Sequence, residues 1–531
     1  MFWRKKHLQT DSVPGWFGKQ LEENIRALRQ GDKIRIAWIL CVFTENHEQS
    51  RLLAARALRD TLDTLSFNEI VCIDRQIRQT TSMEWSIDWC GLDVNSFFTS
   101  QMDTQDKRAL IVFSSFNPNG YIREQAVKAM QDYDMTLPFI ILRQNDWVLQ
   151  VRQAASMAYA YRMQRLSGGE LLAALPFAEK LNRGSRGAHD EFAGLFFTAL
   201  TSPEHSQDLI HGLRSKEIRT RRICIDALFR VNPPKTELAF AHLVYESEPF
   251  LRATIFRKLN SLGQDLNDVI RAFLQDKYPL NRLLAFQYIL EKDKSIEGNA
   301  FAGHAFDVAQ RLLLDKNAMV RAAAQQTVQE QEPQFDFHGF YLDNLDKNTA
   351  AAISGLGEKG HALDAVVLNE YLSDARVSVV KSTMVTLVKL DEDNSIHVIT
   401  EKLDDSRAGI TKTAGKLVMK AKLPNYERVR EIFFATTYKH TKLKCLDILF
   451  SAPKWSGILF MLETLSSNDE HIREKSFTAI TGWLFRFNRS FSSPSEEQVV
   501  RIKQMIQKHN EESPPILPLS VQKELLFTLP F

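Results

Sequence analysis

The chain has 531 residues, of which 44% are hydrophobic and 25% are charged. These fractions match globular proteins and exclude a largely disordered chain. The 67 basic and 65 acidic residues nearly cancel, which argues against a surface built throughout to hold a nucleic-acid backbone.

The N-terminal residues and the cysteines bear on the compartment. Residues 1–6 are aromatic and basic, but polar residues follow and no apolar run of signal-peptide length comes next. Residues 36–43 are too few to span a bilayer, which needs about 20 apolar residues, so we expect a buried helix there. The five cysteines form no Cys-x-x-Cys pair, which favours a reducing compartment. We predict a cytoplasmic protein without a transmembrane segment.

One pattern recurs along most of the chain. Apolar residues at helical spacing are separated by short polar links. In each copy a basic residue is followed at +3 by a residue that is small in nine of eleven copies, and at +7 by an apolar residue. The basic anchors are Arg51, Arg123, Arg152, Arg221, Arg252, Arg282, Arg321, Lys381, Lys412, Lys442 and Arg473. The 31 and 30 residues that separate Arg221, Arg252 and Arg282 indicate a solenoid, whose repeats are about 20–50 residues long.

The columns have a physical reason. The two helices of a pair cannot bury their apolar faces alone, so successive pairs stack on one another. A small residue at +3 permits close approach, and +3 and +7 share one helix face. Acidic residues that lie six or seven positions before several anchors fall in the turn between the helices, where they can cap the second helix. We predict an all-α superhelix of roughly 13–15 helix pairs.

These columns resemble the HEAT-repeat family, in the form found in bacterial HEAT-repeat proteins. The clearest copies are residues 145–155, Asn-Asp-Trp-Val-Leu-Gln-Val-Arg-Gln-Ala-Ala, and residues 315–324. The resemblance implies an α-solenoid in which turn aspartates and helix arginines form a ladder between repeats. Asp146, Arg152, Asp276, Arg282, Asp315 and Arg321 match that ladder, so we assign them a structural role.

The spacing also suggests where the repeat stops or changes. We predict N-terminal capping helices in residues 1–44, the solenoid in residues 45–485, and a C-terminal cap and tail in residues 486–531. Irregular breaks interrupt the solenoid near residues 82–101, 291–306 and 331–341.

Two sets of residues are candidates for partner binding. The first break contains Trp85, Trp89, Phe97 and Phe98. Aromatic residues are enriched at binding hot spots, although these four would also suit the core of an irregular repeat. The second set is Arg214, Arg219 and Arg222, in the densest basic stretch. The +5 column, with three basic and two acidic residues, forms no uniform basic groove for phosphates, so protein is favoured over nucleic acid as the partner.

No enzyme motif is found. The sequence lacks metal-ligand spacing, a phosphate-binding loop, a nucleophile elbow and a catalytic-cysteine signature. The glycine-rich run at residues 355–360 follows no strand, so we expect a loop that ends a helix. We predict no catalytic residue, no cofactor and no metal. The favoured function is a non-catalytic scaffold or adaptor that binds protein on the concave face of a HEAT solenoid.

Other functions stay open. A DNA-repair glycosylase on a HEAT-like array would need an inward carboxylate beside aromatic residues, and Asp146 with Trp147 is the nearest such pair. A bilin lyase is a further alternative that rests on the fold alone. Membrane association through residues 1–6 is a third.

Overall fold

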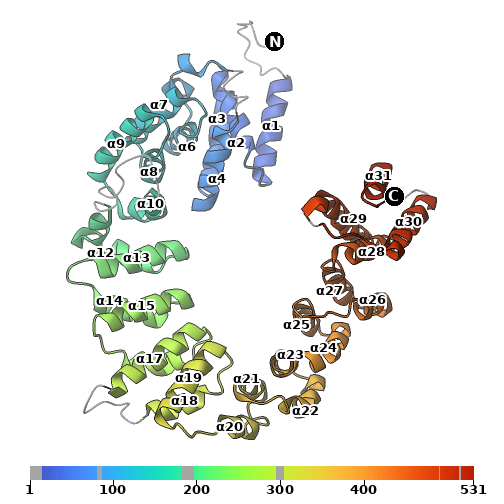
Figure 1. Cartoon of the computed structure of the whole chain (residues 1–531). Coiled ribbons are helices and arrows are strands. Elements are labelled where there is room, and N and C mark those ends of the chain that lie inside the picture. The colour runs from blue at the N-terminus through green and yellow to red at the C-terminus, as the bar shows by residue number, and fades with distance from the viewer. Residues whose placement is uncertain are drawn as a thin grey trace. The chain divides into compact units, whose positions relative to one another are not determined.

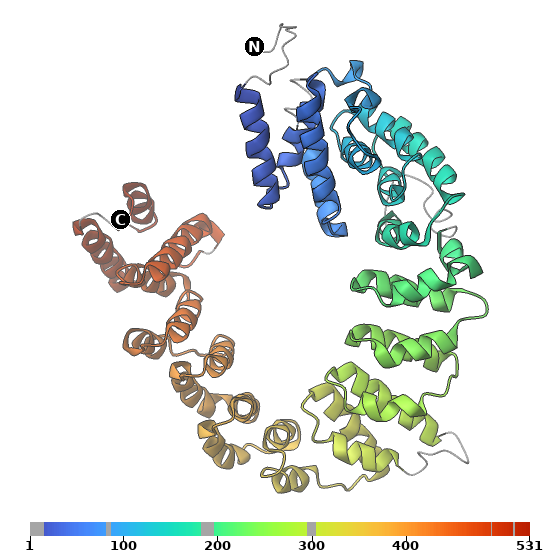
Figure 2. The same cartoon turned by 180° about the vertical axis from the view of Figure 1, so that it is seen from behind.

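A computed structural model of the whole chain describes most of the sequence. The described residues are 15–80, 87–181, 196–294, 304–489, 491–512 and 516–530. Every regular element among them is a helix, and they contain no strand, which confirms the all-α prediction. The chain divides into two compact units, Met1–Val269 and Ile270–Phe531, which are called unit 1 and unit 2 below. The two views in Figures 1 and 2 show both units as stacks of short helices.

Unit 1 begins with α1 and runs to the start of α16; η denotes a short 3₁₀ helix. Its elements are α1 (Gly15–Arg29), α2 (Arg35–Leu40), η1 (Cys41–Thr44), α3 (Glu48–Leu62), α4 (Phe67–Arg78), η2 (Trp89–Gly91), η3 (Val94–Phe97), α6 (Thr104–Ser114), α7 (Gly120–Met130), α8 (Leu137–Arg143), α9 (Leu149–Met163), α10 (Gly168–Leu181), η4 (Pro203–His205), α12 (Ser206–Leu213), α13 (Ile218–Arg230), α14 (Thr236–Tyr245) and α15 (Pro249–Ser261). The boundary between the units falls inside α16 (Asn267–Leu274).

Unit 2 continues the same architecture to the C-terminus. Its elements are α17 (Pro279–Lys294), α18 (Ala305–Leu312), α19 (Ala318–Gln331), α20 (Phe337–Asp343), α21 (Thr349–Lys359), α22 (Asp364–Leu368), η5 (Asn369–Ser373), α23 (Val377–Leu390), α24 (Glu392–Glu401), η6 (Lys402–Asp404), α25 (Ala408–Val418), α26 (Tyr426–Ala435), α27 (Lys439–Leu449), α28 (Lys454–Thr464), α29 (Glu470–Phe485), η7 (Phe487–Arg489), α30 (Glu496–Glu511) and α31 (Leu519–Phe527).

Helices pair along the chain and the pairs stack. In unit 1, α6 packs on α7, α8 on α9, α12 on α13 and α14 on α15. The second helices of these pairs also pack on one another, α7 on α9 and α13 on α15. In unit 2, α21, α23, α25 and α27 form such a row. Figure 1 shows the first helices of these pairs, α20, α22, α24 and α26, as a second row beside it. The chain is therefore an α-solenoid of HEAT-type helix pairs, as the repeat columns predicted.

The repeat columns account for the core, with one shift of register. Every residue at +3 from a basic anchor is buried, and so is nearly every residue at +7. The exceptions at +7 are Val388, which is half-buried, and Met419, which is exposed. Met419 lies just beyond the end of α25, whose buried residues are Ile410, Ala414 and Val418 among others. The prediction of a buried +7 residue is therefore wrong at this copy, because the helix ends one residue earlier.

The glycine-rich run at residues 355–360 lies mostly inside α21, so the predicted loop is wrong there. Gly355 packs against the buried ring of Tyr341, and a Cβ at Gly355 would lie 2.2 Å from Tyr341 Cε1. The glycine thus permits close packing between α20 and α21 instead of ending the helix.

The C-terminal helices cover the last regular pair. Leu517, Leu525 and Leu529 are buried in one cluster with Ile458 and Trp483. Residues 1–6, on which the proposed membrane contact depends, lie outside the described residues. In the part of the chain that is described, no helix combines the length and apolar character needed to cross a bilayer.

Candidate functional site

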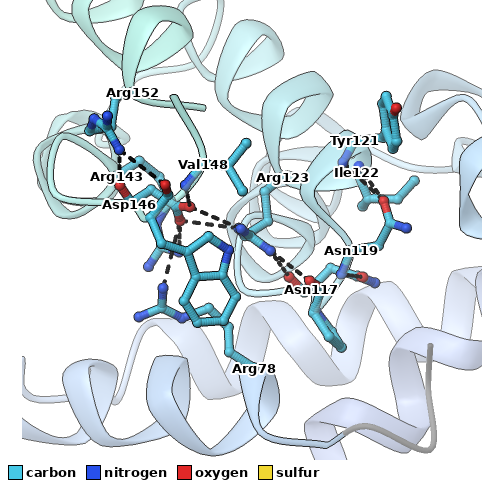
Figure 3. A network of polar contacts seen from close by, with 12 residues as sticks. Arg78, Asn117, Asn119, Tyr121, Ile122, Arg123, Arg143, Asp146, Val148 and Arg152 are labelled. Carbon is cyan, nitrogen blue, oxygen red and sulfur yellow. Dashed lines mark hydrogen bonds and ion pairs between the residues drawn. The ribbon is translucent and has the colours of Figure 1, made fainter. Parts of the chain in front are cut away.

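A buried ion pair joins α7 to the turn before α9. Nε and Nη2 of Arg123 donate to the two carboxylate oxygens of Asp146 at 3.1 and 2.9 Å, and both side chains are fully buried. The backbone N–H of Val148 donates to the same carboxylate at 3.1 Å, and Figure 3 shows these bonds converging on it. The N-cap of α9 is Val148, so Asp146 does not cap the helix as the turn column predicted. Its carboxylate instead holds the backbone N–H of Val148 two residues on, and it also binds the preceding repeat.

More arginines surround this pair. Arg143 lies 3.2 Å from Asp146 and also donates to the buried Asp74. Arg78 pairs with Asp74 at 2.8 Å. The guanidinium groups of Arg78 and Arg123 both lie 5.2 Å from the ring centre of Trp147, within reach of a cation–π interaction. Three buried or half-buried arginines thus share two carboxylates.

The cluster shifts the pKa values of Asp146 and Arg78. Burial acts to raise the pKa of Asp146, but hydrogen bonds from Arg123 and the charges of Arg143 and Arg123 outweigh it and hold that pKa below its usual value. Burial lowers the pKa of Arg78, and the charge of Arg143 lowers it further against the opposing effect of Asp74. The surroundings of Arg78 therefore favour an additional negative charge.

The same contact recurs between other pairs, as the ladder described above. Arg221 bonds Glu246 at 3.0 Å, Arg282 bonds Asp315 at 2.6 Å, and Arg321 bonds Glu358 at 3.1 Å. The arginine of each second helix also donates to the backbone carbonyl at its own turn. These bonds are Arg152 to Asp146, Arg282 to Asp276 and Arg321 to Asp315, at 2.7 Å each. At Asp146 and Asp315 the carboxylate thus bonds an arginine of the previous repeat, while the backbone carbonyl bonds an arginine of its own repeat.

The aromatic candidates of the first break divide by exposure. Trp89 and Phe97 are buried, and Phe97 packs against Phe43 with ring centres 6.0 Å apart, so both suit the core-filling alternative. Phe98 is half-buried under the ammonium of Lys107, 5.6 Å away. Trp85 lies outside the described residues.

The structure brings two of the three basic candidates together. Arg219 and Arg222, both in α13, each pair with Glu179 of α10. The guanidinium of Arg219 lies 4.5 Å from the ring centre of Phe67. Arg214 is exposed and borders a separate hollow beside α14.

Arg219 also borders a pocket that the sequence did not reveal. The pocket lies between α4, α8, α10 and α13, encloses about 590 Å³ and is called the α4–α13 pocket below. Its lining includes Phe67, Arg75 and Arg78 from α4, and Phe177 and Lys180 from α10. Phe67, Val71 and Arg75 are four residues apart and so share one face of α4, which is the signal that the sequence offered.

A second surface consists of apolar residues at helix starts. Tyr121, Leu149, Ile218 and Phe250 occupy the first or second position of α7, α9, α13 and α15, with exposed fractions between 51% and 63%. These four residues are called the apolar helix starts below. The starts of α7 and α9 adjoin, because a Cβ at Gly120 would meet Cγ2 of Val148 at 3.4 Å.

The comparisons with known proteins return weak likeness to solved structures alone. No protein-family model matches the sequence, and no curated protein matches it. Yeast importin-β (Kap95p) has a TM-score of 0.33 and 10% identity, covering 94% of this chain and 67% of that one.

Two further karyopherin structures are similar. Kap95p, from a study of its binding to RanGDP, has a TM-score of 0.29 and 10% identity, with 96% of this chain and 63% of that chain covered. Kap121p bound to Pho4p has a TM-score of 0.22 and 13% identity, with 91% and 48% covered. The chain thus spans less than two thirds of both proteins in these structures. Likeness this weak transfers no residue role and no partner to this chain.

Proposed function

We propose that this protein is a non-catalytic scaffold that binds protein partners, and that the apolar helix starts of unit 1 form part of its binding surface. The observation that carries the proposal is the recurrence of an exposed apolar residue at the first or second position of four second helices, namely Tyr121, Leu149, Ile218 and Phe250. Single exposed apolar residues are ordinary, whereas a repeated set points to an interaction site.

The last four second helices of unit 2 supply the contrast, although α19 of the same unit also carries an exposed apolar residue, Met319, at its second position. The second positions of α23, α25, α27 and α29 hold Ser378, Gly409, His440 and His471. The fold therefore does not require an apolar residue at a helix start. Tyrosine and phenylalanine there offer large contact areas at a low cost in side-chain entropy, as suits a surface that meets another protein.

The contacts of Asp146 support binding over base release. A glycosylase would need a carboxylate open to its substrate, but Asp146 is buried and accepts bonds from Arg123, Arg143 and Val148. Release of alkylated bases from duplex DNA by the wild-type protein would overturn the non-catalytic proposal.

The test is quantitative capture of partners from extract of the source cell after mild cross-linking. The bait is the wild-type chain or a variant that carries Tyr121→Ser, Leu149→Ser, Ile218→Ser and Phe250→Ser. We expect the variant to lose a specific set of partners by at least about tenfold, since hot-spot residues contribute about 2 kcal/mol or more each.

A matched control replaces four exposed apolar residues of unit 2 with serine, namely Leu363, Val366, Leu423 and Phe485. It should retain the same partners as the wild type. Equal loss in both variants, or unchanged capture by the variant with altered helix starts, would overturn the assignment of the surface.

A further inference from the structure

The α4–α13 pocket carries an excess of positive charge. Its lining contains four basic residues, Arg75, Arg78, Lys180 and Arg219, against two acidic ones, Asp74 and Glu179. The excess equals the formal charge of +2 of the whole 531-residue chain. The balance of charge elsewhere makes this pocket a local exception.

The two carboxylates of the pocket are already engaged. Asp74 accepts hydrogen bonds from Arg143 and Arg78, and Glu179 pairs with Arg222 and Arg219.

The remaining two cations lack such partners. Arg75 and Lys180 are exposed, and neither forms an ion pair with another described residue. These two cations are available to a ligand without the loss of an existing ion pair.

Further arginines near Arg78 add to the positive potential of the pocket. Burial lowers the pKa of Arg78, and the charges of Arg143 and Arg123 lower it further, against the opposing charges of Asp74 and Asp146. An anion in the pocket would reduce this repulsion among guanidinium groups. Because the cluster is partly removed from water, its attraction for an anion is screened less than that of surface lysines.

Apolar side chains form the rest of the lining. Phe67 and Phe177 meet edge to face with ring centres 4.8 Å apart, and Val71 and Leu142 lie beside them. A volume of about 590 Å³ is within the range of sites that hold a ligand of several side chains. A bare phosphate or sulfate would leave this apolar surface unused.

From this combination we propose that the α4–α13 pocket binds a short acidic peptide segment of a protein partner, whose carboxylates face Arg75, Lys180 and Arg78 and whose apolar side chains pack on Phe67 and Phe177. The inference rests on the proposed scaffold function and names the chemistry of one partner. A nucleic-acid strand fits less well, because its affinity depends on many phosphate contacts along a basic track.

The test uses a fluorescein-labelled peptide of alternating glutamate and leucine, with its glutamine–leucine counterpart as the neutral control. Fluorescence anisotropy with the full-length protein should show binding of the acidic peptide and no binding of the neutral peptide. The affinity for the acidic peptide should fall as the salt concentration rises. A single-stranded oligonucleotide of equal charge forms a third arm. Tighter binding of the oligonucleotide than of the peptide would overturn the proposal.

Charge reversal locates the site. The variant Arg75→Glu/Lys180→Glu changes exposed residues without described ion-pair partners and should weaken peptide binding at least about tenfold. The variant Arg501→Glu/Lys503→Glu changes the net charge equally on exposed residues of α30 and should bind like the wild type. Equal weakening of peptide binding in both variants would show that binding depends on the net charge of the protein alone. It would overturn the assignment of the peptide to the α4–α13 pocket.

Cys72 provides a direct readout, because its exposed thiol lines the pocket. Saturating peptide should slow alkylation of Cys72, followed residue by residue by mass spectrometry. Cys90 is exposed outside the pocket lining and should react at an unchanged rate. Binding without protection of Cys72 would place the peptide elsewhere and refute the inference.

The capture experiment separates the two proposals. If Arg75→Glu/Lys180→Glu keeps every partner while the change at the apolar helix starts removes them, the pocket inference fails and the scaffold function stands. If neither variant loses a partner, the scaffold proposal fails as well.

Discussion

Arg221 and Glu246 form a two-pronged ion pair, with Nε and Nη2 of the guanidinium each 3.0 Å from a carboxylate oxygen. Glu246 lies six residues before Arg252, just as Asp146 lies six residues before Arg152. A glutamate therefore serves at a position of the ladder where the turns before α9, α17 and α19 carry aspartate. Its backbone carbonyl accepts from Arg252 at 2.9 Å, so both functions of the turn residue are kept.

This pair leads to a prediction about acid. Burial acts to raise the pKa of Glu246, but hydrogen bonds from His242, Arg221 and the backbone of Glu248 outweigh it and lower that pKa to about 2. A carboxylate with a depressed pKa stabilises the fold above its ordinary pKa of about 4.5, and this contribution is lost as the pH falls toward 2. Glu246→Gln should be less stable than the wild type near neutral pH, with the difference shrinking below about pH 4.5.

Thermal unfolding of both proteins, followed by circular dichroism across this pH range, measures that difference. A gap between the two melting temperatures that stays constant from neutral pH to about pH 2.5 would contradict the role of the Glu246 charge.

The buried pair of Arg123 and Asp146 gives a prediction about stability. Arg123→Ala should lower the free energy of unfolding by about 3–5 kcal/mol, because it leaves a buried carboxylate without its principal donor. The double variant Arg123→Met/Asp146→Leu should lose less stability than the sum of the losses in Arg123→Met and in Asp146→Leu, each measured alone. Denaturant unfolding measures the total, and amide hydrogen exchange in α7 and α9 shows where protection is lost. Additive losses would mean that the two side chains are not coupled.

Because α20 and α21 pack closely, one added methyl group at Gly355 should lower the stability of the protein. Gly355→Ala should destabilise the protein by about 1–3 kcal/mol, as overpacking does, because the new Cβ would overlap the ring of Tyr341. Gly169→Ala in α10 is the control, since nothing lies within 4 Å of its Cβ position, and it should be neutral or stabilising by up to about 1 kcal/mol. Similar denaturation midpoints for the two variants would refute the packing argument.

The C-terminal cover can be tested within one helix. Leu525 is 1% exposed and Phe527 is 92% exposed, both on α31. Leu525→Ala should cost about 2–5 kcal/mol through lost burial, while Phe527→Ala should stay within about 0.5 kcal/mol. Chemical denaturation with size-exclusion chromatography of each variant tests both values. A Phe527→Ala variant that unfolds more readily than Leu525→Ala would show that α31 packs by its other face.

The fold could be predicted from the sequence because its determinants are local and repeated. The basic anchors, the +3 column and the turn aspartates recur along the chain, and stacked pairs bury the residue at +3 in every copy. The prediction failed where a helix ended early, as at Met419, or where a glycine served packing, as at Gly355. Both depend on a particular neighbour that periodicity does not specify.

The candidate site could be predicted only in part. Arg219 stood out by charge, but its place beside Phe67 and Lys180 depends on helices far apart in the sequence. Glu246 was overlooked as a ladder residue although it occupies the expected column. Glu358 could not have been found, since it lies within α21 and not at a turn.

The ladder also constrains how such a chain can lengthen or shorten over evolutionary time. Arg123, Arg221, Arg282 and Arg321 each bond a carboxylate of the following repeat. Removal of one complete pair, α18 with α19, would therefore place Arg282 next to the repeat that holds Glu358, the acceptor of Arg321. A deletion of part of a helix pair would instead leave a buried arginine without its carboxylate partner. Duplication and loss of whole helix pairs would therefore preserve the ion pairs between repeats, whereas smaller insertions or deletions inside a helix pair would disrupt them.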